Sequence, residues 1–257
     1  MHFTKSLPLS LGAAVLLAAA LPPQAQAMPV PGQGTWKTSL QARDLDGNFS
    51  NGPEAYYDTA QGITWLADAF EARTSGYQAR PYYPRGDSLI WPHAVEWANN
   101  LILYGIADWR LPRSSDTGAQ GCVILNAGGE CGFNVNPASS ELAHMFHLTL
   151  GNISYLAANG TVAPGGGLTN TGPFFNLLAG HSWSETDYNA AHAWNFDFNF
   201  GYQAPSIKSA QGSTVWAVLD GDRGTPMSPV PESGAAALMA LGLAALIGQH
   251  RRQRPAH

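Results

Sequence analysis

The sequence has little charge, few cysteines and none of the short motifs that mark common nucleotide-binding and hydrolytic sites. Charged residues make up 12% of the 257 residues, whereas hydrophobic residues make up 45% and glycine occurs 28 times. The chain has no G-x-S-x-G, no P-loop, no G-x-G-x-x-G with an acidic partner and no H-E-x-x-H. The enzyme classes defined by those motifs are therefore excluded. The composition favours a loop-rich extracellular module.

Cysteine is confined to two positions, Cys122 and Cys131. Their spacing excludes a C-x-x-C redox pair, and two sulfurs alone would make an incomplete zinc site. In an oxidising compartment, two cysteines closing a short loop form a disulfide. We therefore predict a Cys122–Cys131 disulfide.

The first 27 residues have the pattern of a secretory signal peptide. One lysine lies in Met1–Lys5, Leu7–Leu21 is apolar, and Ala25-Gln26-Ala27 gives the small-x-small cleavage pattern. Residues 1–27 are thus predicted to be removed, with an uncleaved anchor as the alternative. The protein is expected to be exported.

The C-terminus has the order of a membrane sorting signal. A Pro-rich linker (225–233) ends in Pro231-Glu232-Ser233, an uncharged apolar segment follows at 234–249, and residues 250–257 are basic, with Arg251 and Arg252. As a helix the apolar run is about 22 Å long, which is shorter than the helix of about 20 residues that a stable membrane anchor needs. A basic cluster is retained on the cytoplasmic side.

This tail resembles the PEP-CTERM sorting signal of Gram-negative bacteria. It departs from that pattern at Ser233, where a second proline is usual. The resemblance implies a transient inner-membrane anchor, an exosortase-type processing enzyme as partner, and a final place at the cell surface or in the extracellular matrix. A simple C-terminal membrane tail is the alternative.

Residues 28–224 are expected to form one extracellular domain with a core of its own. Between residue 28 and the tail, nine basic residues stand against 17 acidic ones, a net charge of −8. Like charge raises the cost of approach to phosphate or sulfate polymers. We therefore expect no nucleic-acid partner.

The periodicity predicts an α+β domain with two short helices, several short antiparallel strands and long loops. One helix is expected to begin near Pro92 and to end just before Gly105. A second begins near Ser139 or Ser140, with Leu142, Phe146 and Thr149 on its buried face. Strands are predicted at 55–58, 63–66, 181–185, 193–200 and 214–219. In the 193–200 strand, strict alternation predicts Trp194, Phe196, Phe198 and Phe200 on one face and Asn195, Asp197 and Asn199 on the other.

Several sequence blocks occur in a recognisable order. They are AYYDTAQGITWLADA, DWRLP, SSELAHMF, NTGPFFNL, SWSETDY, AWNFDFNFG and VWAVLDGD. Their order resembles the Lcl C-terminal-like domain family over about residues 43–223. The resemblance implies a C-type-lectin-like or sulfatase-modifying-factor-like α+β fold. The family's founding example, the C-terminal domain of a bacterial collagen-like adhesin, binds glycans.

The motif Asp108-Trp109-Arg110-Leu111-Pro112 is the most distinctive local feature of the body. We interpret Arg110 as structural, its guanidinium bridging a carboxylate and nearby carbonyls while its stem packs on tryptophan. A functional arginine is the alternative. The body of the chain includes the six tryptophans Trp65, Trp97, Trp109, Trp183, Trp194 and Trp216. Core packing is expected for at least four of them, and the alternative is that their aromatic faces stack on sugars.

No cofactor is expected, and calcium is the alternative. Asp44-Leu45-Asp46-Gly47-Asn48 resembles the start of a calcium loop but lacks the glycine and glutamate positions of an EF-hand. The alternative calcium site is nonlocal and would use Asp187, Asp197, Asp220 and Asp222. Glu141, His144 and His147 share a helix face that a transition metal can use.

Three functions remain open. The first is a non-catalytic binding module for extracellular polysaccharide or matrix glycan. The second is an extracellular enzyme of lectin-like fold, which predicts a deep pocket with convergent carboxylates or thiols. The third is a structural matrix protein with no specific ligand, which predicts a filled interior.

Overall fold

The computed structural model describes residues 34–75, 89–118, 122, 124–125, 129–210 and 213–227. The predicted signal peptide with Ala25 and Ala27 therefore lies outside the described residues. So do the Pro231-Glu232 motif, the 234–249 segment and the basic tail with Arg251 and Arg252. Within the described ranges, no helix is both long enough and apolar enough to cross a membrane.

The first sheet has the order β10-β1-β2-β3-β9 and is antiparallel throughout. Its central hairpin confirms the strands predicted at 55–58 and 63–66, which turn at Gly62 with a positive φ of 70°. The strands are β1 (Leu40–Asp44), β2 (Ala55–Asp58), β3 (Ile63–Leu66), β9 (Val218–Asp220) and β10 (Thr225–Pro226).

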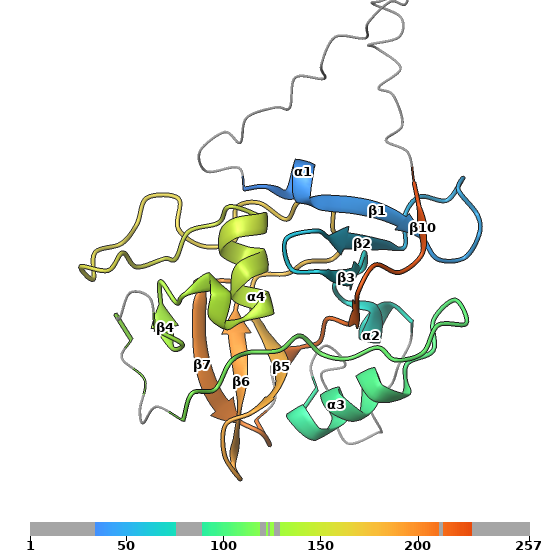
Figure 1. Cartoon of the computed structure of the whole chain (residues 1–257). Coiled ribbons are helices and arrows are strands. Elements are labelled where there is room, and N and C mark those ends of the chain that lie inside the picture. The colour runs from blue at the N-terminus through green and yellow to red at the C-terminus, as the bar shows by residue number, and fades with distance from the viewer. Residues whose placement is uncertain are drawn as a thin grey trace, which may run out of the picture.

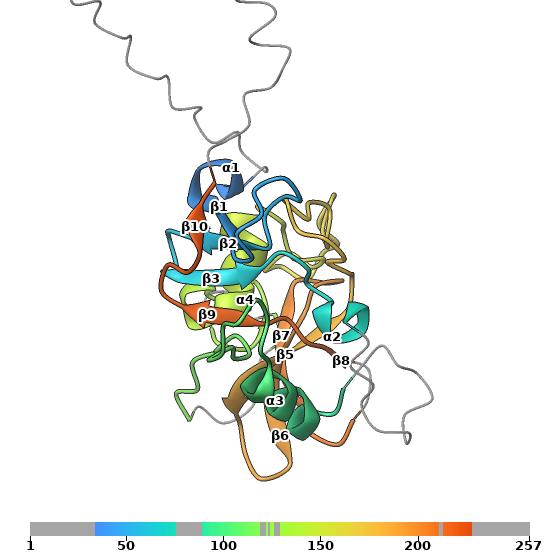
Figure 2. The same cartoon turned by 90° about the vertical axis from the view of Figure 1, so that its right-hand side faces the viewer.

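The second sheet has the order β4-β7-β6-β5-β8, in which only the β5–β8 pair is parallel. Its strands are β4 (Gly132–Phe133), β5 (His181–Asp187), β6 (His192–Asp197), β7 (Tyr202–Ile207) and β8 (Ser213–Thr214). In Figures 1 and 2 the first sheet lies above the second, and α1, β1 and β10 are all at the upper end.

The helical segments are short. They are α1 (Trp36–Ser39), α2 (Glu71–Thr74), α3 (Trp91–Asn100), the 3-10 turn η1 (Pro137–Ser139), α4 (Glu141–His144) and the π-helical turn η2 (Met145–Thr149). The two predicted helices are therefore confirmed as α3 and as α4 with η2. Two single turns, α1 and α2, were not predicted, because one helical turn is too short to show a periodic pattern.

The starts of both predicted helices follow the expected chemistry, but one end differs. Pro92 lies in the first turn of α3, and the Ser140 hydroxyl accepts the Ala143 N–H at 3.2 Å at the start of α4. However, α3 ends at Asn100 and not near Gly105. Gly105 instead closes a separate tight turn, in which Tyr104 and Gly105 both have positive φ and Leu103 pairs with Ile106.

The last third of the chain differs from its predicted strands at two places. β6 ends at Asp197, because the Asp197 side chain accepts the Asn199 N–H at 2.7 Å and its carbonyl accepts the Gly201 N–H, which turns the chain. Phe200 is therefore exposed in a turn, and Asn195 and Asp197 are buried like their apolar neighbours. The strand predicted at 214–219 is split between β8 and β9, which belong to different sheets.

The core lies between the sheets and the helices, and it is unusually rich in tryptophan. All six tryptophans discussed above are at most 2% exposed, so the core interpretation is confirmed for each of them. The ring of Trp65 on β3 packs against that of Trp216, which lies just before β9, with centroids 4.5 Å apart and the rings tilted by 55°. Phe146 of η2 meets Phe196 of β6 at 5.3 Å, which joins the helical layer to the second sheet. The domain is thus α+β.

Candidate functional site

A groove of about 650 Å³ lies where α1, β1 and β10 meet, at the end of the domain that carries both described chain ends. We call it the terminal groove. Its walls include Trp36, Lys37, Gln41, Tyr56, Pro173 and Met227. Its volume is within the usual range for small-ligand sites.

The position of α1 on the domain depends on Gly34. This residue has a φ of +68°, and a Cβ there would lie 2.3 Å from the Thr149 carbonyl oxygen, so only glycine fits. The next residue, Thr35, donates its N–H to the Leu148 carbonyl at 3.1 Å. The single turn that presents Trp36 is therefore held against η2.

The groove has aromatic walls and one ammonium group. The Tyr56 ring packs edge-on against Phe174 with centroids 5.4 Å apart, and burial raises the pKa of its phenol, which stays neutral at ordinary pH. The Lys37 ammonium lies 5.4 Å from the centroid of the Trp36 ring. Within the described part of the chain, no carboxylate pairs with Lys37.

Arg43 also borders the groove, but its charge is satisfied inside the protein. Its guanidinium binds both carboxylate oxygens of Asp222 at 2.6 and 2.9 Å, and it also donates to Gln41 Oε1 and the Ala42 carbonyl. The hydrogen bond from Arg43 lowers the pKa of Asp222. Since the described lining contains no acidic residue, Lys37 is the charged group that the groove offers to a ligand.

A second candidate is the loop between β1 and β2. Asp44, Asp46 and Glu54 each place one carboxylate oxygen within 4.8 Å of the other two. The backbone N–H groups of Gly47, Asn48 and Leu45 donate to these three carboxylates. Hydrogen bonds from Asn48 and Asn51 lower the pKa of Asp46. Such a set of oxygens is one that calcium prefers.

The sequence pointed to Asp44 and Asp46 but missed Glu54. Glu54 joins them because Ala55, the next residue, pairs with Arg43 across the hairpin. Tyr104 is also close by. Its pKa is raised by burial and then by the charges of Glu71, Glu54, Asp46 and Asp68. Nothing in the local sequence relates Tyr104 to this loop.

The other proposed metal sets are not assembled. Glu141 is held by Arg110, the His147 Nδ1 lies 3.3 Å from the Asn152 carbonyl, and the His144 Nδ1 lies 3.3 Å from Thr149 Oγ1. Burial lowers the pKa of His147 to about 4. The four aspartates proposed as a nonlocal calcium site each face a basic group instead: Asp187 faces Lys208, Asp197 faces His181, Asp220 faces Arg110 and Asp222 faces Arg43.

Arg110 occupies the structural position that its motif suggested. Its guanidinium binds Glu141 through two bonds of 2.8 Å, Asp220 Oδ1 at 3.0 and 2.6 Å, and the Leu111 carbonyl at 3.0 Å. Burial acts to lower the pKa of Arg110, but the two carboxylates raise it above its ordinary value. The residue thus ties α4 to β9.

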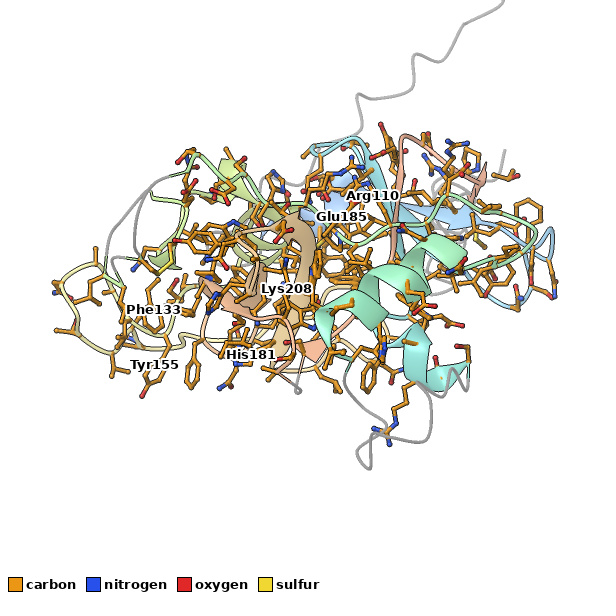
Figure 3. All side chains as sticks on the ribbon, turned by 90° about the horizontal axis from the view of Figure 1, so that it is seen from below. Arg110, Phe133, Tyr155, His181, Glu185 and Lys208 are labelled. Carbon is orange, nitrogen blue, oxygen red and sulfur yellow. A yellow bond between two sulfur atoms is a disulfide. The ribbon has the colours of Figure 1, made fainter. Side chains whose placement is uncertain are left out.

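The rest of the motif supports the same joint. Trp109 is buried and donates its indole N–H to the Ile106 carbonyl at 3.0 Å, Leu111 is buried, and the Pro112 carbonyl accepts the Glu185 N–H. Asp108 is exposed, with a φ of +67°. Figure 3 labels Arg110 and Glu185, and the Arg113 guanidinium connects Glu185 and Asp220 at the rim of this joint.

The Cys122–Cys131 disulfide is confirmed, with Cα atoms 5.3 Å apart. Beside it lies a second group of aromatic rings. Tyr202, whose hydroxyl is 3.8 Å from Cys122 Sγ, contacts Phe133, and the exposed Tyr155 contacts Phe200 with centroids 5.3 Å apart. Phe133 and Tyr155 are labelled at one end of the molecule in Figure 3. The strands and loops that carry these aromatic rings differ from those that line the terminal groove.

The chain matches no protein-family model, no curated protein and no solved structure.

Proposed function

We propose that the chain is an exported, surface-held, non-catalytic module that binds extracellular polysaccharide or matrix glycan in the terminal groove. The observation that carries this proposal is the combination of Trp36 and Tyr56 with Lys37, Thr38 and Gln41 in one open groove. A sugar ring has an apolar C–H face that can pack on an aromatic ring, and hydroxyl groups that need hydrogen-bond partners at its edge.

The same groove argues against the two alternatives. A hydrolytic enzyme of this kind requires convergent carboxylates or a free thiol, and neither lines the described walls of the groove. Both cysteines are joined in the disulfide. A purely structural matrix protein would need no open groove of this size.

Delivery follows from the two ends of the chain. In this proposal the signal peptide exports the protein across the inner membrane of a Gram-negative bacterium. The PEP-CTERM-like tail then holds it transiently for an exosortase-type enzyme. Two small sheets, long loops and described chain ends on the same side of the domain support a C-type-lectin-like domain of the Lcl C-terminal-like kind. Fold likeness alone does not establish ligand binding, so the groove has to be tested directly.

A glycan array probed with the full chain tests the proposal, in a detergent whose headgroup is not a sugar. We expect binding that weakens on the order of tenfold in Trp36→Ala, because the stacking surface is lost. Tyr155→Ala is the matched control, since it removes an exposed aromatic ring at the disulfide end. Absence of binding to every glycan would refute the function. Loss of binding in Tyr155→Ala but not in Trp36→Ala would refute the site.

A further inference from the structure

Three asparagines of the chain lie in the pattern Asn-x-Ser or Asn-x-Thr, which is the acceptor pattern for N-linked glycan in exported proteins. They are Asn48 in Asn-Phe-Ser, Asn152 in Asn-Ile-Ser and Asn159 in Asn-Gly-Thr. The pattern is short enough to occur by chance, so the fold decides which of the three an enzyme can use. A usable acceptor presents its carboxamide nitrogen at the surface, because that nitrogen forms the bond to the sugar.

Asn152 is not an acceptor in the folded domain. It is only 2% exposed, and its Nδ2 donates a hydrogen bond to the Asn170 carbonyl at 2.8 Å. Its Oδ1 accepts the backbone N–H groups of Thr169 and Asn170, both at 2.9 Å. A sugar on this nitrogen would have to break these buried contacts, which connect the two ends of the loop that follows η2.

Asn48 has the opposite surroundings, on the loop between β1 and β2. All five residues from Asp46 to Ser50 are exposed. The Oδ1 of Asn48 accepts the Ser50 N–H at 3.2 Å and the Ser50 hydroxyl at 2.6 Å, so the serine of the pattern holds the carboxamide in place. Among the described residues, no acceptor takes a hydrogen bond from its Nδ2. This nitrogen is therefore available to an enzyme.

Asn159 has the same local geometry on a separate loop. It is exposed, and its Oδ1 accepts the Thr161 N–H at 3.0 Å and the Thr161 hydroxyl at 2.7 Å. In Figure 1 the 152–168 loop projects from the side of the domain opposite the β1–β2 loop. The two exposed patterns therefore form a natural comparison within one chain.

Charge distinguishes the two exposed patterns. Asp46 stands two residues before Asn48, whereas Ala157 stands two residues before Asn159. The Asp46 carboxylate accepts the Asn48 N–H at 2.7 Å and the Asn51 Nδ2–H at 2.8 Å, and these bonds lower its pKa, so it is ionised at neutral pH. An exposed carboxylate beside the acceptor gives a transferring enzyme a charge to recognise. The loop with Asn48 is therefore the better acceptor.

We propose that Asn48 is an N-glycosylation site of this chain, recognised through Asp46 and Ser50. The co-substrate is an oligosaccharide linked to a polyprenyl diphosphate. The Asn48 Nδ2 attacks the anomeric carbon of the first sugar. A C–N bond forms, the C–O bond to the diphosphate breaks with its electron pair, and Nδ2 gives one proton to a base of the transferring enzyme. The site rests on the export that the proposed function includes, and it does not depend on the terminal groove.

Production of the full chain in a Gram-negative host with an oligosaccharyltransferase and its lipid-linked oligosaccharide, followed by glycopeptide mass spectrometry, tests the site. The host is one that modifies Asp-Gly-Asn-Phe-Ser when these residues are appended to an unrelated exported protein. We expect glycan on Asn48, less on Asn159 and none on Asn152. Glycan on Asn152 or more glycan on Asn159 than on Asn48 would overturn the selection by fold and charge.

The same spectra separate failure of the site from failure of export, because they show whether the signal peptide has been removed. An exported chain with unmodified Asn48 would overturn the site and leave the proposed function standing. A chain that keeps its signal peptide and stays in the cytoplasm would overturn the export and the site together.

Three variants test the recognition residues. Ser50→Ala removes the hydroxyl, and we expect loss of the glycan on Asn48, whereas Ser50→Thr keeps the hydroxyl and the modification. Asp46→Asn should lower the occupancy of Asn48 by up to about fivefold, which corresponds to the loss of one exposed charge contact. Asp108→Asn, at an exposed aspartate on another loop, is the matched control. Unchanged occupancy in Ser50→Ala or in Asp46→Asn would overturn the role of that residue.

Discussion

Replacing Arg110 by methionine tests whether this residue stabilises the fold by connecting α4 to β9. The change keeps most of the buried stem and removes five hydrogen bonds of 2.6 to 3.0 Å, four of them to carboxylates. Arg110 is only 5% exposed, so its guanidinium is fully committed to these partners. Removing one member of a buried ion pair costs about 3–5 kcal/mol.

The exposure of the two carboxylates that bind Arg110 places the expected loss of stability at the lower end of that range. The side chain of Asp220 is 62% exposed and that of Glu141 is 21% exposed, so both carboxylates can be hydrated once the guanidinium is gone. We therefore expect Arg110→Met to lower the free energy of unfolding by about 3 kcal/mol. In a domain of this size the melting temperature should fall by about 6–12 °C.

Urea and thermal unfolding of Arg110→Met, Asp220→Asn and the double variant provide the assay. Because Arg110 lowers the pKa of Asp220, that carboxylate stabilises the fold above its unfolded pKa and loses the contribution as pH falls through its folded value. Arg110→Met should therefore flatten the acid limb of the stability curve below about pH 4. A loss under about 0.5 kcal/mol, or lost glycan binding with unchanged stability, would refute the structural interpretation.

Three further predictions use the same unfolding assays. Gly201→Ala should destabilise the fold by more than about 2 kcal/mol, because Gly201 has a φ of +65° and a Cβ there would lie 2.6 Å from Phe146 Cε1; wild-type stability would show that the turn can shift. Burial lowers the pKa of His147 to about 4, so the folded state keeps this imidazole neutral, whereas the unfolded state takes up a proton below about pH 6.5. The free energy of unfolding should therefore fall by at most about 3 kcal/mol as the pH is lowered from about 6.5 to about 4. His147→Gln should flatten this limb, and an unchanged slope would contradict the assignment. EDTA should leave the melting temperature unchanged, because the Asp44, Asp46 and Glu54 carboxylates already accept backbone N–H groups; a fall that calcium reverses would establish an ion there.

Features fixed by neighbouring residues could be predicted from the sequence. The β2–β3 hairpin, the Pro92 start of α3 and the Ser140 cap of α4 each depend on a turn or capping residue within a few positions. The burial of the tryptophans also followed, because large aromatic side chains in short strands are usually core residues.

Features that depend on distant partners could not be predicted. The alternation of β6 suggested one polar face, but Asn195 and Asp197 are buried as well, so both faces of this strand are covered. Residues 214–219 were predicted as one buried strand, yet they are divided between β8 in the second sheet and β9 in the first. The hydrophobic pattern of a strand indicates that the strand is buried, but it does not indicate which sheet the strand joins.

The candidate sites show the same limit in their chemistry. Arg110 was recognisable from its motif, but its partners Glu141 and Asp220 lie on α4 and β9, far along the chain. Glu54 joins Asp44 and Asp46 only through the β1–β2 register, and the terminal groove exists only because β10 returns to β1. That return also brings the start of the Pro-rich linker against the groove.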